Sequence, residues 1–137
     1  MGIDVKTMMK NTVRVGVVSA INAENMTARV DFEDMDNNVS AELPILNRGS
    51  KKVKDYWIPD IGEQVVCLFS SRDTNTSIGW IIGTHFSAAD TPNAADANIR
   101  RVDFGDGSYI EYDRGSQSMT INCAGPLTIK GSTVNIN

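Results

Sequence analysis

Several residue types that mark common protein classes are scarce in this chain. Of its 137 residues, two are cysteine, one is histidine and four are proline. Cys67 and Cys123 lie far apart among apolar neighbours, so we expect free thiols and no disulfide framework. A single histidine without neighbouring cysteine makes a poor metal site. We therefore expect His85 to be a structural hydrogen-bonding residue and expect no cofactor, although three copies meeting on an axis would leave a shared site open.

Long apolar runs and an excess of positive charge are also missing. No apolar stretch approaches the roughly 20 residues of a membrane helix. The N-terminus lacks the apolar core of a secretory signal, so we expect a soluble protein made in a cytoplasm. The 13 basic residues against 17 acidic ones give a net charge of −4. An acidic chain has no general attraction for phosphate backbones, and nucleic-acid binding is not expected.

Catalytic and phosphate-binding motifs are absent from the sequence: it has no glycine-rich phosphate loop, no Ser/His/Asp set and no CxxC pair. Acid–base catalysis by carboxylates needs one of them held protonated in an apolar pocket. The one carboxylate cluster falls at outward positions or corners of short strands, where carboxylates stay ionised. Turn contacts and pairing between chains with Arg100, Arg101 or Arg114 explain it better, so we predict no enzymatic activity; the cluster comprises Asp103, Asp106, Glu111 and Asp113.

Alternating apolar and polar residues predict strands across residues 13–86. Val13, Val15 and Val17 alternate with Arg14 and Gly16, which is typical of a half-buried strand. A short helix or arm at 1–12, with Asp4 as its N-cap, is expected to precede it. Five strands with a long excursion between the third and the fourth predict a small closed barrel; the other strands are expected at 26–33, 39–43, 64–70 and 78–83, with turns at 34–38 and 71–77.

The pattern changes after residues 87–98, which are small and polar and predict a linker. In residues 99–137, very short strands recur about every eight residues and are separated by glycine-containing corners such as Asp106–Gly107. Each strand offers a narrow apolar face and little else. The inward positions are predicted to be Val102, Phe104, Ile110, Tyr112, Met119, Ile121, Leu127, Ile129, Val134 and Ile136.

So short a segment cannot enclose a core on its own, because it removes too little surface from water to offset the chain entropy. If three chains each supply one wall of a triangular prism, these apolar side chains point to a threefold axis and Thr120, Asn122 and Thr128 face water. The alternative is a flat antiparallel meander, which would leave exposed edges and one uncovered face. The intertwined trimeric shaft is the favoured interpretation.

A basic run lies in the excursion of the barrel. It is either a solvated loop or a docking site for an acidic surface of a partner, and its cations are Arg48, Lys51, Lys52 and Lys54. A barrel that binds single-stranded nucleic acid needs stacking aromatics on its second and third strands. Phe32 is the one aromatic residue there, and it occupies an inward position. Three other aromatic residues are expected in the barrel core or rim, or in a subunit contact: Tyr56, Trp57 and Trp80.

Five stretches of the chain, taken in order, carry a resemblance to a known family. They are residues 13–16 (VRVG), 28–32 (ARVDF), 57–66 (WIPDIGEQVV), 79–83 (GWIIG) and 101–113 (RVDFGDGSYIEYD). The chain resembles the phage baseplate assembly protein V family, the central spike of contractile tails, and more distantly the spike proteins of type VI secretion. The resemblance implies an OB-fold barrel at 13–86, the linker 87–98 and a triple-stranded β-helix shaft at 99–137, assembled as a homotrimer.

The resemblance also implies a function and a set of partners. The protein would be a structural spike in the baseplate of a contractile phage tail or a tailocin, assembled in the cytoplasm of the bacterial host. It would cap the tail tube at the hub protein and puncture the host cell envelope. Longer members bind iron at the tip through a His-x-His motif, but the only histidine here is His85. A separate tip protein or a truncated chain is therefore expected.

Two other functional classes stay open from the sequence. One is a free OB-fold module that binds nucleic acid or glycan. The other is a hydrolase acting on the cell wall, although the chain lacks the lysozyme-like insertion of some spikes.

Overall fold

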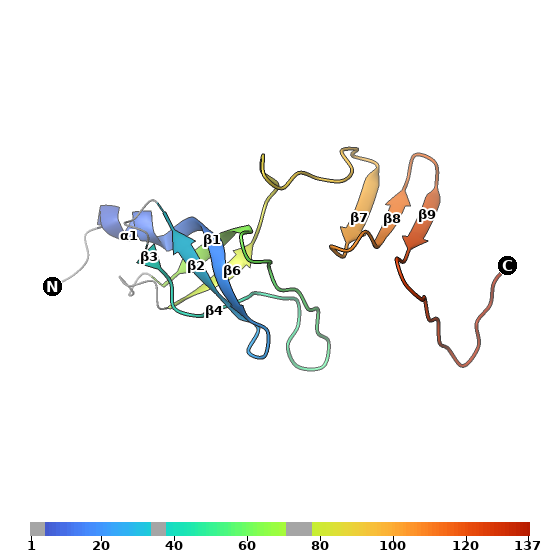
Figure 1. The fold of residues 1–137 in the computed structure, drawn as a ribbon, viewed down its shortest axis with the longest axis horizontal. Helices are drawn as coiled ribbons and strands as arrows, with labels where there is room; N and C mark the ends of the chain where they lie inside the picture. Colours follow the sequence, from blue (N-terminus) through green and yellow to red (C-terminus); the bar gives the residue numbers. More distant parts are fainter. Residues whose placement is uncertain (1–4, 34–37, 71–77) are drawn as a thin grey trace. The chain divides into compact units, whose positions relative to one another are not determined.

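A computed structural model describes residues 5–33, 38–70 and 78–137 of the chain (Figure 1). The prediction of a mostly β protein is confirmed, and both of the described sheets are antiparallel. The chain divides into two compact units, residues 1–90 and 91–137. Within the described ranges, no helix is long and apolar enough to cross a membrane.

The described residues of the first unit form one helix and a six-stranded sheet. Helix α1 (Val5–Thr12) leads directly into β1 (Val13–Asn22), where the short helix or arm was expected. The strand order is β3-β2-β1-β5-β6, with β4 paired to β2. The expected N-cap Asp4, the turn expected at 71–77 and all but the last residue of the turn expected at 34–38 lie outside the described residues, and Asn38 itself begins β3. The remaining strands are β2 (Thr27–Phe32), β3 (Asn38–Val39), β4 (Leu43–Pro44), β5 (Gln64–Phe69) and β6 (Gly79–Gly83).

In the described residues, no continuous ladder of hydrogen bonds closes the sheet. The predicted closed barrel is therefore wrong for this part of the chain. The two ends of the sheet meet at one parallel bridge between Ile45 and Ile81, beside a hydrogen bond of 2.9 Å from Leu46 N to Ile81 O. The predicted third strand is two separate pieces, β3 and β4. Between them Ser40 is buried, and its hydroxyl oxygen accepts a 3.0 Å hydrogen bond from Val30 N. This contact interrupts the strand.

Strand β1 buries the face opposite to the one that its valines suggest. Val13 and Val15 are exposed, whereas Arg14, Gly16 and Val18 are buried. Gly16 allows this orientation because a Cβ atom there would lie 2.5 Å from Val30 Cγ1. The neighbouring strand β2 therefore approaches β1 too closely for a side chain at this position.

The core of the first unit is apolar and draws on five of the six strands. In β2 the residues Ala28, Val30 and Phe32 are buried in alternation, which agrees with the strand expected at 26–33 and the inward position expected for Phe32. Cys67 is also buried, and burial raises the pKa of its thiol to about 12. The core comprises Val18, Ala28, Val30, Phe32, Leu43, Ile45, Val65, Cys67, Phe69 and Ile81.

The second unit is a three-stranded antiparallel sheet followed by an extended tail. Strands β7 (Ile99–Asp103), β8 (Tyr109–Asp113) and β9 (Ser118–Asn122) pair in chain order (Figure 1). The Asp106–Gly107 corner lies between β7 and β8, where Gly105 and Gly107 have φ angles of +88° and +93°. Residues 99–122 of one chain therefore form a meander, the alternative to the shaft. An intertwined arrangement involves further chains and stays a prediction.

Candidate assembly surface

The sheet of the second unit has one apolar face. In the register, Val102 lies opposite Ile110, and Ile110 lies opposite Ile121. Next to this row, Tyr112 lies opposite Met119 on β9 and opposite Arg100 on β7, so Arg100 is the charged residue at the border of this face. Directly opposed residues of an antiparallel pair project to the same side of the sheet. These five apolar side chains therefore form one continuous surface across β7, β8 and β9.

This apolar face is open to solvent in the single chain. Every residue of the second unit is described, and all ten residues predicted to line the axis are exposed, from 39% for Tyr112 to 90% for Ile136. Isolated exposed apolar residues are ordinary, but a continuous apolar surface marks an interaction site. The structure thus brings Val102, Ile110, Tyr112, Met119 and Ile121 together on one sheet and leaves them without cover.

The opposite face of the same sheet is polar and makes contacts within the chain. The Arg101 guanidinium contacts Asp103 and Glu111, each with an N–O distance of 3.0 Å. It also stacks 3.6 Å from the centroid of the Tyr109 ring. The hydrogen bond to Glu111, followed by the contacts with Asp103, raises the pKa of Arg101. This face therefore suits solvent, and the apolar face is the one that needs a partner.

The carboxylate cluster has structural contacts. Asp103 and Glu111 pair with Arg101 within one chain, whereas pairing between chains was expected. Asp113 accepts a 2.8 Å hydrogen bond from Gly115 N in a turn. Asp106 accepts a 2.9 Å bond from Ser108 N, and this bond lowers the pKa of Asp106. A lowered pKa keeps a carboxylate ionised, which is the reverse of what a general acid requires.

The last 15 residues, 123–137, form no strand in the single chain, and all of them are exposed. Ala124 N donates a 2.9 Å hydrogen bond to Ser108 Oγ and so ties the beginning of this segment to the loop before β8, whereas the 3.6 Å contact of Cys123 Sγ with Pro126 O lies within the segment. An extended backbone with exposed N–H and C=O groups can accept neighbouring strands. Four of the predicted axial residues lie here: Leu127, Ile129, Val134 and Ile136.

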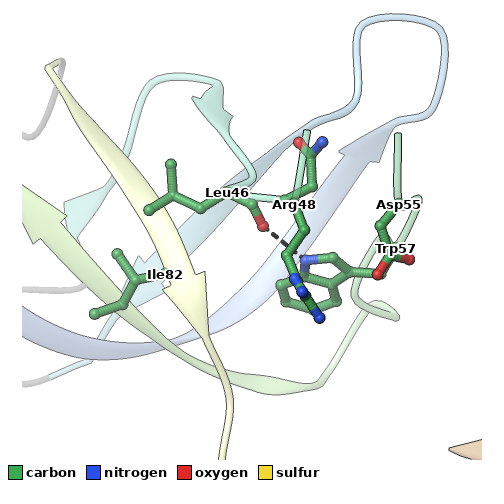
Figure 2. Close-up of a pocket in the computed structure, with 6 residues that line it drawn as sticks. Leu46, Arg48, Asp55, Trp57 and Ile82 are labelled. Atoms are coloured by element: carbon green, nitrogen blue, oxygen red, sulfur yellow. Dashed lines mark hydrogen bonds between the residues drawn. The ribbon is translucent and has the colours of Figure 1, made fainter. Parts of the chain in front are cut away.

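The basic loop of the first unit borders a hollow of about 440 Å³. Figure 2 shows the residues that line it, with Arg48 and Asp55 beside the apolar Leu46, Trp57 and Ile82. The indole N–H of Trp57 donates a 2.8 Å hydrogen bond to the carbonyl oxygen of Leu46, which fixes the ring. The cations Lys51, Lys52 and Lys54 are exposed in the same loop. Both interpretations of this loop, solvated or docking, remain open.

The aromatic residues of the first unit occupy different environments. Trp57 is partly buried and packs against the core, as expected for a core or rim residue. Tyr56 is 73% exposed and Trp80 is 37% exposed. Phe32 is fully buried, so it presents no ring for a base to stack on.

His85 lies near the end of the first unit and lines a hollow of about 310 Å³ with Glu63, Thr84, Phe86 and Asp90. Its Nδ1 atom is 2.9 Å from the carbonyl oxygen of Phe86. Nδ1 donates a hydrogen bond to this oxygen when it carries the ring proton. In the part of the chain that the structure describes, no group of three or more His, Cys, Asp or Glu residues could hold a metal ion.

Comparison with known proteins gives one distant relative and no family match. No protein-family model matches the chain. The chain is similar to the spike protein of Escherichia phage P2, with 22% identity over 114 residues. The matched part covers 83% of this chain and 52% of the relative, so the chain spans about half the length of the curated relative it matches.

Proposed function

We propose that the protein is a structural, non-enzymatic spike of a phage or a phage-tail-like particle. The carrying observation is the continuous apolar face of β7, β8 and β9, which is open in one chain and lies opposite a polar face with its own ion pairs. Three copies would bury this face around a common axis and supply partner strands for the extended tail. The similarity to a phage spike protein points to the same role.

The fold of the first unit is proposed to be an OB-fold. An OB-fold is a partly open, five-stranded barrel. Here β1 pairs with both β2 and β5, and the segment after β4 meets β6 at the Ile45–Ile81 bridge. This order brings the third strand region beside the last strand and leaves the sheet only partly closed. Both features support an OB-fold.

The proposed mechanism is mechanical. In the assembled particle the shaft would transmit the force of tail contraction to the host cell envelope and puncture it. A shaft in which all three walls are hydrogen-bonded has no free lateral edge, and its unravelling requires many bonds to break together. The barrels would seat the shaft on the hub protein and close the tail tube, and a separate protein would supply the tip. The basic loop is the proposed contact with the hub.

The proposal is tested by the solution mass of the purified chain. Light scattering should give about three times 14.9 kDa, and an unheated gel band should collapse only on boiling. Ile121→Asp would place three carboxylates near the axis and should abolish the trimer. Thr120→Lys, on the opposite face of the same strand and directly across from Glu111, is the charged control and should remain trimeric. A monomeric wild type, or a stable trimer of Ile121→Asp, would contradict the proposal.

A further inference from the structure

A second apolar surface lies on the outer face of β1, β5 and β6 in the first unit. Burial alternates along β5, β6 and residues 13–18 of β1, so that every second residue there points away from the core. None of the outward residues carries a charge, and all but one are apolar: Val13, Val15, Val17, Gln64, Val66, Leu68, Trp80 and Ile82.

The register joins these residues into a continuous surface. Val13 lies opposite Leu68, and Leu68 lies opposite Trp80, which gives one row across three strands. Val15 lies opposite Val66 in the next row. Val13 is 54% exposed, Val15 is 42% exposed and Trp80 is 37% exposed, whereas Val66 and Leu68 between them are half-buried, so the described chain covers this face only in part.

Strands with apolar residues on both faces are typical of sheets that are covered on both sides. In β5, the outward Val66 and Leu68 accompany the buried Val65, Cys67 and Phe69. One side of this strand faces the core, whereas Val66 and Leu68 on the other side are half-buried, and α1 lies close to β1 and β5. An exposed, charge-free surface of this kind marks an interaction site.

We infer that the outer face of β1, β5 and β6 packs against the first unit of a second copy of this chain. The inference rests on the proposed homotrimer. Only the 15 residues 84–98 connect β6 to β7. First units attached to a common shaft are therefore held at an effective concentration on the order of millimolar. Under these conditions the apolar faces of the three copies can meet around the common axis and cover one another.

The size and the charge of the surface favour this occupant. The eight outward residues are far fewer than the roughly 20–30 residues per partner of a stable independent interface. The face cannot hold two free proteins together, but it can pack when the shaft has already joined them. A charge-free face offers nothing specific to an acidic partner surface, for which the loop with Lys51 and Lys52 is better suited.

Thiol labelling of the full chain tests this inference. Val15→Cys and Ile21→Cys are made in a Cys123→Ser background, in which the remaining Cys67 is buried. Val15 and Ile21 are 42% and 41% exposed in one chain, and Ile21 lies opposite the buried Ala28, on the other face of β1. In the trimer we expect the thiol at position 15 to react at least tenfold more slowly than the thiol at position 21. Ile82→Cys, also at 42% exposure, replaces Val15→Cys if that variant does not fold.

The outcomes separate this inference from the proposed function. A trimer in which both thiols react at the same rate would overturn the inference and leave the spike proposal standing. A monomeric wild type would overturn both. Adding Ile121→Asp, which is expected to separate the copies, should restore labelling at position 15. Protection that persists in the separated chain, or that arises only when phospholipid vesicles are added, would show that something other than a second copy covers the face.

Discussion

The guanidinium carbon of Arg14 lies 4.0 Å from the centroid of the Phe32 ring, inside the core of the first unit. The Phe69 ring is 6.0 Å away, and the two rings meet edge to face at 5.6 Å. Arg14 is only 6% exposed, although it stands in an alternating run of valines that would normally place it in water. Its side chain therefore acts as a packing element between two aromatic rings.

Replacement of Arg14 should destabilise the first unit. Arg14→Ala removes both the cation–π contact and the buried stem, so we expect a loss of about 2–3 kcal/mol in the free energy of unfolding. Arg14→Met keeps most of the volume and should lose less. Urea denaturation at a fixed protein concentration measures both variants. A change below about 0.5 kcal/mol for Arg14→Ala would show that the side chain contributes little to the core.

The close approach of β1 and β2 predicts a sharp difference between two glycines. A Cβ atom at position 16 would lie 2.5 Å from Val30 Cγ1 and 2.7 Å from Asp31 O, whereas one at position 83 meets nothing within 4 Å. Gly16→Ala should therefore cost about 1–3 kcal/mol through overpacking. Gly83→Ala, in β6, should stay close to the wild type. Equal thermal midpoints for the two variants would show that β2 can move away without cost.

Strand positions could be predicted from the sequence more securely than strand orientation. Ala28, Val30 and Phe32 are buried and alternate with exposed or half-buried polar residues, so the inward position predicted for Phe32 is correct. In β1 the polar-looking set contains an arginine and a glycine, and both are buried. Their burial depends on the aromatic rings and on the close approach of β2, which are tertiary features that no local pattern records.

The apolar face of β7, β8 and β9 could be predicted only in part, because alternation shows which residues share a face but not what covers them. Alternation along β7, β8 and β9 identifies which residues share a face, and the register places Val102, Ile110 and Ile121 in one row. The partners of Arg101 could not be read from the sequence, because several carboxylates lie within its reach. The residues that cover the apolar face belong to other molecules, so their packing on a threefold axis stays a prediction.

The buried Cys67 predicts a pH-dependent loss of stability in alkali. Burial raises its pKa in the folded chain to about 12, from an ordinary value of 9.0. The protonated thiol is therefore favoured in the folded state, and its contribution to stability is complete below about pH 9. As the pH rises from about 9 to 12, the unfolded chain can ionise first, so the free energy of unfolding should fall. Cys67→Ala should lack this component when both proteins are melted across that range, and parallel curves for the two would contradict the burial argument.

The basic loop predicts a negative result with single-stranded DNA. Four cations lie within residues 48–54, but the net charge of the chain is −4 and Phe32 is buried. Phosphate contacts alone would give weak binding that disappears between about 50 and 200 mM salt. We therefore expect no mobility shift at micromolar protein in 150 mM salt. Lys51→Glu with Lys52→Glu should behave like the wild type in this assay. A shift that the wild type produces and this double variant loses would instead favour a nucleic-acid-binding module, because it would assign the loop to phosphate recognition.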